Sequence, residues 1–90
     1  GKFVYFFEDG SEMENGNFHR GKKDGKWVRW SENGNKVAEA TYDSGNKDGK
    51  WLIWDDKGTL RHEMYFEDGK KVGTWKMWDE NGTIMATKDF

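Results

Sequence analysis

The sequence predicts an all-β protein, an elongated antiparallel sheet of tandem β-hairpins with a 24-residue period. The pattern at residues 49–54, Gly-Lys-Trp-Leu-Ile-Trp, recurs 24 positions away at residues 25–30 and 73–78. The runs between glycines are short and rich in aromatic and β-branched residues, and no apolar period of a helix is present. Self-similarity at such a period is typical of arrays in which each unit is stabilised by stacking on the next.

The repeat frame divides the chain into one array of units 1–24, 25–48 and 49–72 and a partial unit 73–90. Residues 1–6 fit the same frame, with Phe in place of Trp. We number repeat positions from the opening glycine of each unit. A chain of 90 residues suits a single small domain.

Aromatic residues occupy three repeat positions and form the predicted structural rows. The members are Phe3, Trp27, Trp51 and Trp75 at position 3; Phe6, Trp30, Trp54 and Trp78 at position 6; and Phe18, Tyr42, Phe66 and Phe90 at position 18. Because the chain has little other apolar material, we expect these rows to supply the core. An exposed row would instead offer a platform for sugar rings or choline-like groups through stacking and cation–π contact.

The first unit reads as a strand at residues 2–6, a turn at 7–10 and a second segment that runs to Phe18. That second segment contains Glu12, Glu14, Asn15 and Gly16, which predict a weakened strand. Terminal units of repeat arrays are often atypical in this way.

The second and later units repeat the hairpin with stronger turn signals. Asn33-Gly34 and Asn81-Gly82 predict tight turns, because both residue types tolerate the positive φ that such turns need. The connection at residues 43–49 and its equivalents read as polar loops bracketed by glycines. Each unit is therefore expected to be one hairpin plus one loop.

Positions 3 and 6 lie three residues apart, so their side chains point to opposite faces of a regular strand. Either both faces carry aromatic rows, or a bulge brings the two rows together. In both cases position 18 is expected to stack on one of the rows in cross-strand pairs.

The cysteine content and the charge of the chain limit the kinds of ligand that it can bind. The chain has no cysteine. Its net charge of −2 argues against nonspecific binding to nucleic acid or to an anionic membrane through overall charge, and we expect no nucleic acid partner. Positions 7–10 hold seven acidic residues and one lysine, whereas positions 19–24 with the lysines that follow hold eight basic and five acidic residues. If these segments lie at opposite edges, the protein is electrically polarised. The compartment cannot be read from the sequence.

The recurring Gly-[Lys/Thr]-Trp-x-x-Trp-x-x-x-Gly, with an aromatic residue at position 18 and glycine at position 21, resembles the MORN repeat. It is more closely similar to the bacterial MORN-variant repeat of antitoxin-like proteins. The resemblance covers the whole chain and implies hairpin-stacked sheets. It also implies scaffolding, protein binding or phospholipid contact. The Trp-x-x-Trp motif and the 24-residue unit depart from the commoner MORN unit, which weakens the lipid-binding expectation.

Catalytic patterns are weak, and we expect no cofactor, no metal and no enzyme activity. His19 and His62 occupy different repeat positions without ligand spacing, and we expect them to be solvated. The acidic pairs Asp55-Asp56 and Asp79-Glu80 are more typical of solubilising turns than of calcium or acid–base sites.

The leading functional hypothesis is a repeat module that binds a protein partner across its sheet, as a scaffold or antitoxin-like protein. The alternative is a module that binds anionic phospholipid head groups, glycans or choline. Lys23, Lys47 and Lys71, which share position 23, would then form a stripe for an anionic partner, although a solvated edge is the simpler reading. The terminal strands lack proline, so we also expect either a longer array or end-to-end self-association.

Overall fold

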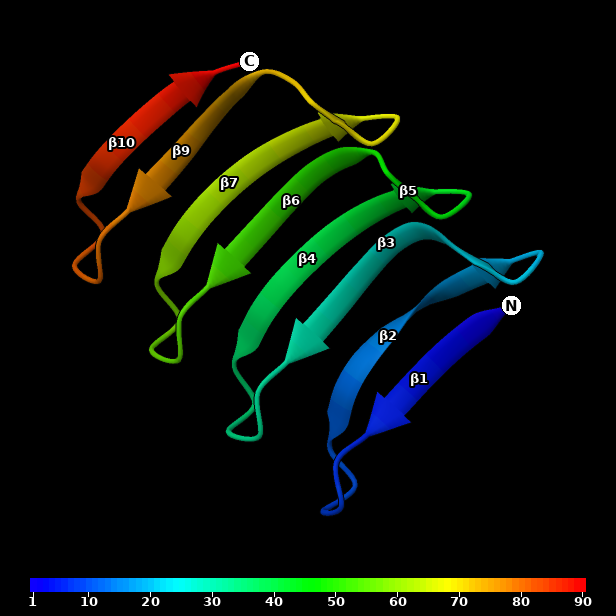
Figure 1. Ribbon diagram of the computed structural model, residues 1–90. Coiled ribbons are helices and arrows are strands. Elements are labelled where there is room, and N and C mark those ends of the chain that lie inside the picture. Colours follow the sequence, from blue (N-terminus) through cyan, green and yellow to red (C-terminus); the bar gives the residue numbers. More distant parts are fainter.

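The computed structural model describes residues 1–90 and forms one open sheet (Figure 1). The strands are β1 (Lys2–Phe6), β2 (Glu12–His19), β3 (Lys22–Trp30), β4 (Lys36–Asp43), β5 (Asn46–Lys47), β6 (Gly49–Trp54), β7 (Leu60–Glu67), β8 (Lys70–Lys71), β9 (Thr74–Trp78) and β10 (Ile84–Asp89).

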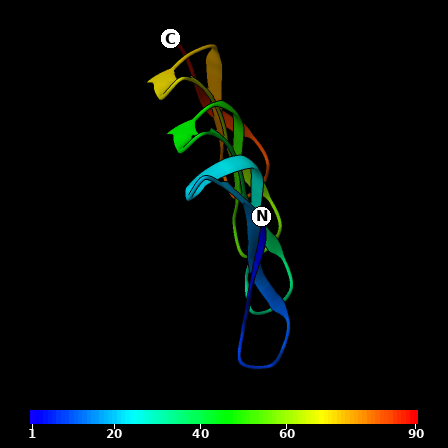
Figure 2. The ribbon, with the colours of Figure 1, turned by 90° about the vertical axis from the view of Figure 1, so that its right-hand side faces the viewer.

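The sheet is a meander in which chain order equals spatial order. Its main path runs β1-β2-β3-β4-β6-β7-β9-β10, every pairing is antiparallel, and the short strands β5 and β8 pair with β4 and β7. The molecule measures 36 × 32 × 10 Å, and its smallest dimension corresponds to the thickness of a single layer. Figure 2 shows this layer from the side, with the β2–β3, β4–β5 and β7–β8 connections curled out of it in one direction. The chain contains no helix long and apolar enough to cross a membrane.

The turns at positions 7–10 differ from the predicted tight turns. Each is a four-residue turn in which the glycine N–H bonds to the carbonyl at position 7, as from Gly34 to Ser31 at 3.0 Å. Gly34 and Gly82 have the expected positive φ of 87° and 84°, but Asn33 and Asn81 do not share it. A two-residue type I′ turn requires positive φ at both central residues, so the Asn-Gly pairs do not form turns of this type.

The two-residue turns lie instead in the segments read as polar loops. Ser44 and Gly45 have φ of 48° and 90° and join β4 directly to β5. Arg20-Gly21 and Asp68-Gly69 repeat this geometry at the same positions. Positive φ at both central residues is the signature of type I′ turns. Both connections of every unit are therefore hairpins, and the expected loop is absent.

A β-bulge recurs at position 13, where one residue of the second strand is skipped in the pairing. The skipped residues are Met13, Val37, Arg61 and Met85. Because the bulge lies on the second strand, the first strand stays regular between positions 3 and 6. Their side chains therefore lie on opposite faces, and the sheet carries an aromatic row on each face.

The first unit is less degenerate than expected, because β2 is eight residues long, as are β4 and β7. Gly16 lies at an irregularity of the β2–β3 pairing and makes room for a ring. A Cβ at Gly16 would lie 2.1 Å from the Trp27 indole, far inside van der Waals contact. The one glycine outside the repeat frame is thus explained by a packing requirement.

The core is thin because no second layer covers either face. Only Gly16, Trp27 and Phe66 are buried, and most other aromatic rings are half-buried. The two sets of turns lie at opposite ends of the strands (Figure 1), with the acidic turns at one end and the basic connections at the other. This arrangement gives the electrical polarity that the charge pattern predicts.

Candidate binding surface

One face of the sheet carries a ladder of rings from positions 3 and 18, which we call the ladder face. Neighbouring ring centroids lie 4.7 to 5.4 Å apart in edge-on or tilted pairs, a favourable geometry for aromatic contacts. The first run is Phe3, Phe18 and Trp27, and the second is Tyr42, Trp51, Phe66, Trp75 and Phe90. The expected stacking of position 18 on one of the two rows is therefore observed, and the row is position 3.

The position 3 tryptophans are held by the preceding unit. Trp27 Nε1 donates to the Asn17 carbonyl at 3.1 Å, and Trp51 Nε1 donates to the Thr41 carbonyl at 3.0 Å. Trp75 Nε1 makes the same bond to Tyr65 at 3.0 Å. Each indole N–H thus has a partner at position 17, which satisfies a polar group and fixes the orientation of the ring.

The lysines of position 23 lie over this ladder. Lys23 Nζ is 4.7 Å from the Trp27 ring and 5.2 Å from the Tyr42 ring, and so bridges the break between the two runs. Lys47 and Lys71 each lie within 5.5 Å of two rings in the same way. Such contacts contribute about 0.5–1 kcal/mol each at exposed sites. The lysines form a row along the ladder, with their ammonium donors available to an anionic group.

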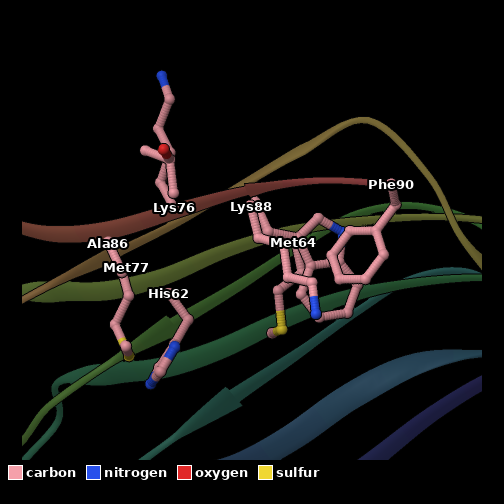
Figure 3. Close-up of a pocket in the computed structure, with 9 residues that line it drawn as sticks. His62, Met64, Lys76, Met77, Ala86, Lys88 and Phe90 are labelled. Atoms are coloured by element: carbon pink, nitrogen blue, oxygen red, sulfur yellow. The ribbon is translucent and has the colours of Figure 1, made fainter.

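A cavity of about 340 Å³ opens on the ladder face near the carboxyl end (Figure 3). Its apolar lining comes from Met64, Trp75, Met77, Ala86 and Phe90. In Figure 3 the Met77 side chain points to the side of His62 and Met64, whereas that of Lys76 points away to the other side of the sheet. The size is within the range of binding pockets.

His62 also lines this cavity and is half-buried, which differs from the expected solvated position. His19 is exposed at the end of β2, as expected. No group of three or more histidine, cysteine or acidic side chains is arranged to hold a metal ion.

The opposite face carries the position 6 row, which makes no ring pair with the ladder. Phe6 is exposed and Trp30, Trp54 and Trp78 are half-buried. Lys36 Nζ lies 5.7 Å from the Trp54 ring.

Glu39 forms the main ionic cluster and joins two strands. Its Oε1 lies 3.0 Å from Lys36 Nζ and 3.6 Å from Lys26 Nζ. Burial alone would raise the pKa of Glu39, but the two lysines outweigh it and hold that pKa below its ordinary value.

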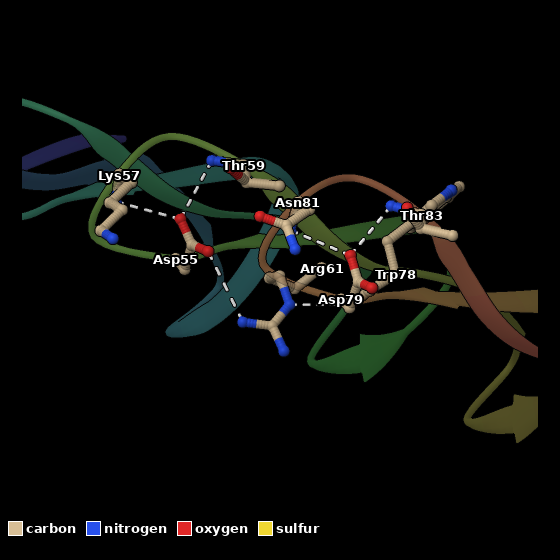
Figure 4. Close-up of polar contacts among 8 residues, drawn as sticks. All are labelled: Asp55, Lys57, Thr59, Arg61, Trp78, Asp79, Asn81 and Thr83. Carbon is tan, nitrogen blue, oxygen red and sulfur yellow. Dashed lines mark hydrogen bonds and ion pairs between the residues drawn. The ribbon is translucent and has the colours of Figure 1, made fainter.

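The acidic turns have a structural role (Figure 4). Asp55 Oδ1 accepts the backbone N–H groups of Lys57 and Thr59, both at 3.0 Å, and Arg61 Nη1 lies 3.5 Å from Oδ2. The Thr59 N–H, with smaller contributions from Lys57 and Arg61, outweighs desolvation and holds the pKa of Asp55 below its ordinary value.

Asp79 repeats the arrangement by accepting from Asn81 at 2.9 Å and Thr83 at 3.0 Å. These two carboxylates therefore close turns.

The cavity residues were missed at the sequence level. Met64 is at position 16, and Met77 is at position 5. The register pairs Trp51 with Met64 and Ile53 with His62, which places positions 5, 14 and 16 on the same face as position 3. Side chains alternate between the two faces along a strand, so the sequence alone could have placed position 5 on the same face as position 3. Positions 14 and 16 lie on the neighbouring strand, and only the strand register places them on that face.

Comparison with known proteins gives one family. The model described as "MORN repeat variant" matches residues 23–44, 47–68 and 71–90. The matched segments recur at the 24-residue period and begin at Lys23, Lys47 and Lys71. No curated protein and no solved structure matches the chain.

Proposed function

The chain belongs to the MORN repeat variant family, and on this premise we propose that it is a non-enzymatic module that binds a protein partner through its ladder face. The observation that carries the proposal is the uncovered apolar surface of that face. In a sheet one layer thick, the 340 Å³ cavity has the half-buried Met64, Trp75 and Met77 in its lining, and no second layer of the fold covers them. Methionine and aromatic side chains are enriched where proteins bind one another.

The charges beside the cavity indicate the chemistry of the partner. Lys71 and Lys88 lie over the ring of Phe90, which lines the cavity. A protein segment with apolar anchors flanked by acidic residues would fill the cavity and pair with these lysines. A scaffold and an antitoxin-like inhibitor would both use such a surface.

The absence of enzyme activity is part of the proposal. The carboxylates that the sequence offered for acid–base work, Asp55 and Asp79, are hydrogen-bonded to their own turns. In both turns the Oδ1 atom accepts two backbone N–H groups, which fixes the carboxylate in the turn and gives it a structural role.

The row of lysines supports a second candidate, an anionic head group of a phospholipid or glycan. Lys23, Lys47 and Lys71 repeat along one line and keep donors free. The same row disfavours choline, because each lysine already places an ammonium group over the rings that a choline cation would need.

The test uses two neighbouring residues of β9. Met77→Asp places a charge in the cavity. Lys76 also lines the cavity, but its side chain points to the opposite face, so Lys76→Asp places its charge there. Each tagged variant and the wild type would capture proteins from an extract of the source organism, and candidates would then be purified and titrated by calorimetry. We expect a partner whose affinity falls at least tenfold with Met77→Asp, a change of about 1.4 kcal/mol, and much less with Lys76→Asp.

An equal loss of affinity for the partner in Met77→Asp and Lys76→Asp would contradict binding through the ladder face. Flotation with vesicles containing anionic lipid tests the second candidate. Salt-sensitive binding that is lost when Lys23, Lys47 and Lys71 are changed to Glu would favour it over the protein partner.

A further inference from the structure

A row of side chains from positions 5 and 14 crosses the sheet beside the aromatic ladder. In order across the sheet, and each paired with the next in the strand register, its members are Arg29, Ala38, Ile53, His62 and Met77. We call these residues the cross-strand row. The row lies on the ladder face, because position 5 is two residues from position 3 along each first strand. A ligand that lies along it contacts residues of three units.

A second hollow, of about 190 Å³, opens on the ladder face at the Arg29 end of this row. It coincides with the break in the ring ladder between Trp27 and Tyr42, and both rings line it. Ala40 also lines the hollow and pairs with Trp27 in the register. Position 16 holds this alanine in the second unit but Met64 in the third, so less side-chain volume covers the sheet here.

The second hollow adjoins the cavity described above. Trp51 lines the hollow, Met64 lines the cavity, and the two residues face each other in the register. The half-buried Ile53 lies between the two depressions in the cross-strand row. At the far end, the side chains of His62 and Met77 lie on the same side of the sheet (Figure 3). The row therefore joins an apolar cavity to a hollow of different chemistry.

The hollow has a free cationic group. Arg29 is exposed, and none of the three ion pairs of the structure includes it. A free guanidinium presents a fork of N–H donors that matches a carboxylate. Lys23 also lines the hollow, and Glu14, which pairs with Arg29 in the register, is the acidic residue of its lining. Two cations against one carboxylate leave a net positive charge, which favours an acidic group.

We propose that the protein partner lays an extended segment along the cross-strand row, with an acidic side chain at Arg29 and a large apolar side chain in the cavity beside Met77. This inference rests on the proposed function, because it uses the same face and the same cavity. It adds the direction of the bound segment and the chemistry of its second anchor.

The geometry of the sheet sets the distance between the two anchors. Neighbouring strands lie about 4.8 Å apart, so the four steps from Arg29 to Met77 span about 19 Å. An extended chain advances about 3.3 Å per residue, so the acidic and the apolar side chain should be about six residues apart. An even separation directs both side chains to the same side of the segment.

The probe is a phage-displayed library of random peptides of about twelve residues, long enough to span both depressions. Peptides are selected on the wild-type chain and counter-selected on Met77→Asp, so that those retained use the cavity. We expect the retained peptides to carry an acidic residue and a large apolar residue about six positions apart.

Arg29→Gln and Lys50→Gln form a matched pair of variants for titration with a retained peptide. Each removes one positive charge from an exposed side chain, but Lys50 lies on the opposite face of the sheet. Arg29→Gln should weaken binding about threefold or more, and Lys50→Gln much less. Glu14→Gln should strengthen binding about twofold, because it removes the competing carboxylate. Urea unfolding checks that every variant is folded.

A change in the peptide completes the test. When its acidic residue is replaced by the corresponding amide, Arg29→Gln should have no further effect on affinity. Cavity-dependent peptides that bind Arg29→Gln as tightly as the wild type would overturn this inference and leave the proposed function standing. A library without any peptide sensitive to Met77→Asp would also overturn it, whereas the capture of whole proteins tests the proposed function separately.

Discussion

Trp27 and Trp75 occupy the same repeat position and make the same indole hydrogen bond, but they are buried to different depths. Trp27 is 3% exposed and forms the centre of the core, whereas Trp75 is only half-buried and borders the cavity. The difference comes from the preceding unit. The Trp27 ring packs against Gly16, whereas position 16 of the unit before Trp75 is Met64. The Trp27 ring thus reaches the core beside a residue that has no side chain.

The turns differ in the opposite direction, because the aspartate of the first turn accepts fewer backbone hydrogen bonds than those of two later turns. The Asp9 carboxylate, in the first turn, accepts hydrogen bonds only from Ser11, which donates its backbone N–H and its hydroxyl group. Asp55 and Asp79, in the later turns, each accept two backbone N–H groups from two different residues. The aspartates of these later turns therefore accept more backbone N–H groups than Asp9 does.

The largest expected effect is at the deeper tryptophan. Trp27→Ala should lower the free energy of unfolding by about 3–5 kcal/mol, because it removes a buried ring and leaves a cavity. Trp75→Ala should cost no more than about half of that, since part of its ring already contacts water. Urea titration of both variants measures the difference, with Trp27→Phe as a milder change if Trp27→Ala does not fold. Equal costs would mean that burial depth does not distinguish the two units.

Gly16→Ala should have an intermediate effect. Its Cβ would meet the Trp27 ring at 2.1 Å, and forcing that ring to move should cost about 1–3 kcal/mol. In a Trp27→Ala background the same substitution should cost much less, because the ring that it strikes is gone. A double-mutant cycle from urea unfolding measures this coupling, and a coupling near zero would show that Gly16 acts through β2 alone.

The smallest effect concerns the turns and depends on pH. The pKa of Asp55 lies below its ordinary value of 3.8, so this carboxylate stabilises the fold above that pH, and the contribution is lost as the pH falls through the lowered value. Asp55→Asn keeps an acceptor oxygen but cannot ionise, so its stability should change less than that of the wild type below about pH 4. Asp56→Asn is the matched control, because the Asp56 carboxylate accepts no bond in the turn. Unfolding curves between pH 3 and pH 7 would contradict this role if Asp55→Asn and the wild type changed in parallel.

Much of the architecture could be predicted from local patterns. The 24-residue period, the strand character and the positive φ of Gly34 and Gly82 follow from residue spacing and from the conformational freedom of glycine. The type I′ turns also depend on local sequence, at Asp68-Gly69 and Ser44-Gly45, although we interpreted these segments as longer polar loops. The family resemblance rested on the same motif and is confirmed by the family match.

The candidate site was only partly predictable. The aromatic ladder and the three lysines were identified from their spacing, but the spacing did not show that each ammonium group lies over two rings. That contact depends on the curled connections, which bring the position 23 lysine of each full unit over two rings of the following unit.

The sequence by itself therefore determined the period, the strands and the glycines of the turns, because these depend on residues close together in the chain. Only the tertiary structure decided that the bulge falls at position 13, that Trp27 is buried and Trp75 half-buried, and that Met64 and Met77 line one cavity. Each of these depends on which residues of different strands face each other. Since a shift of one residue in register would turn every side chain of a strand to the other face, strand pairing decides what the chain's own periodicity leaves open.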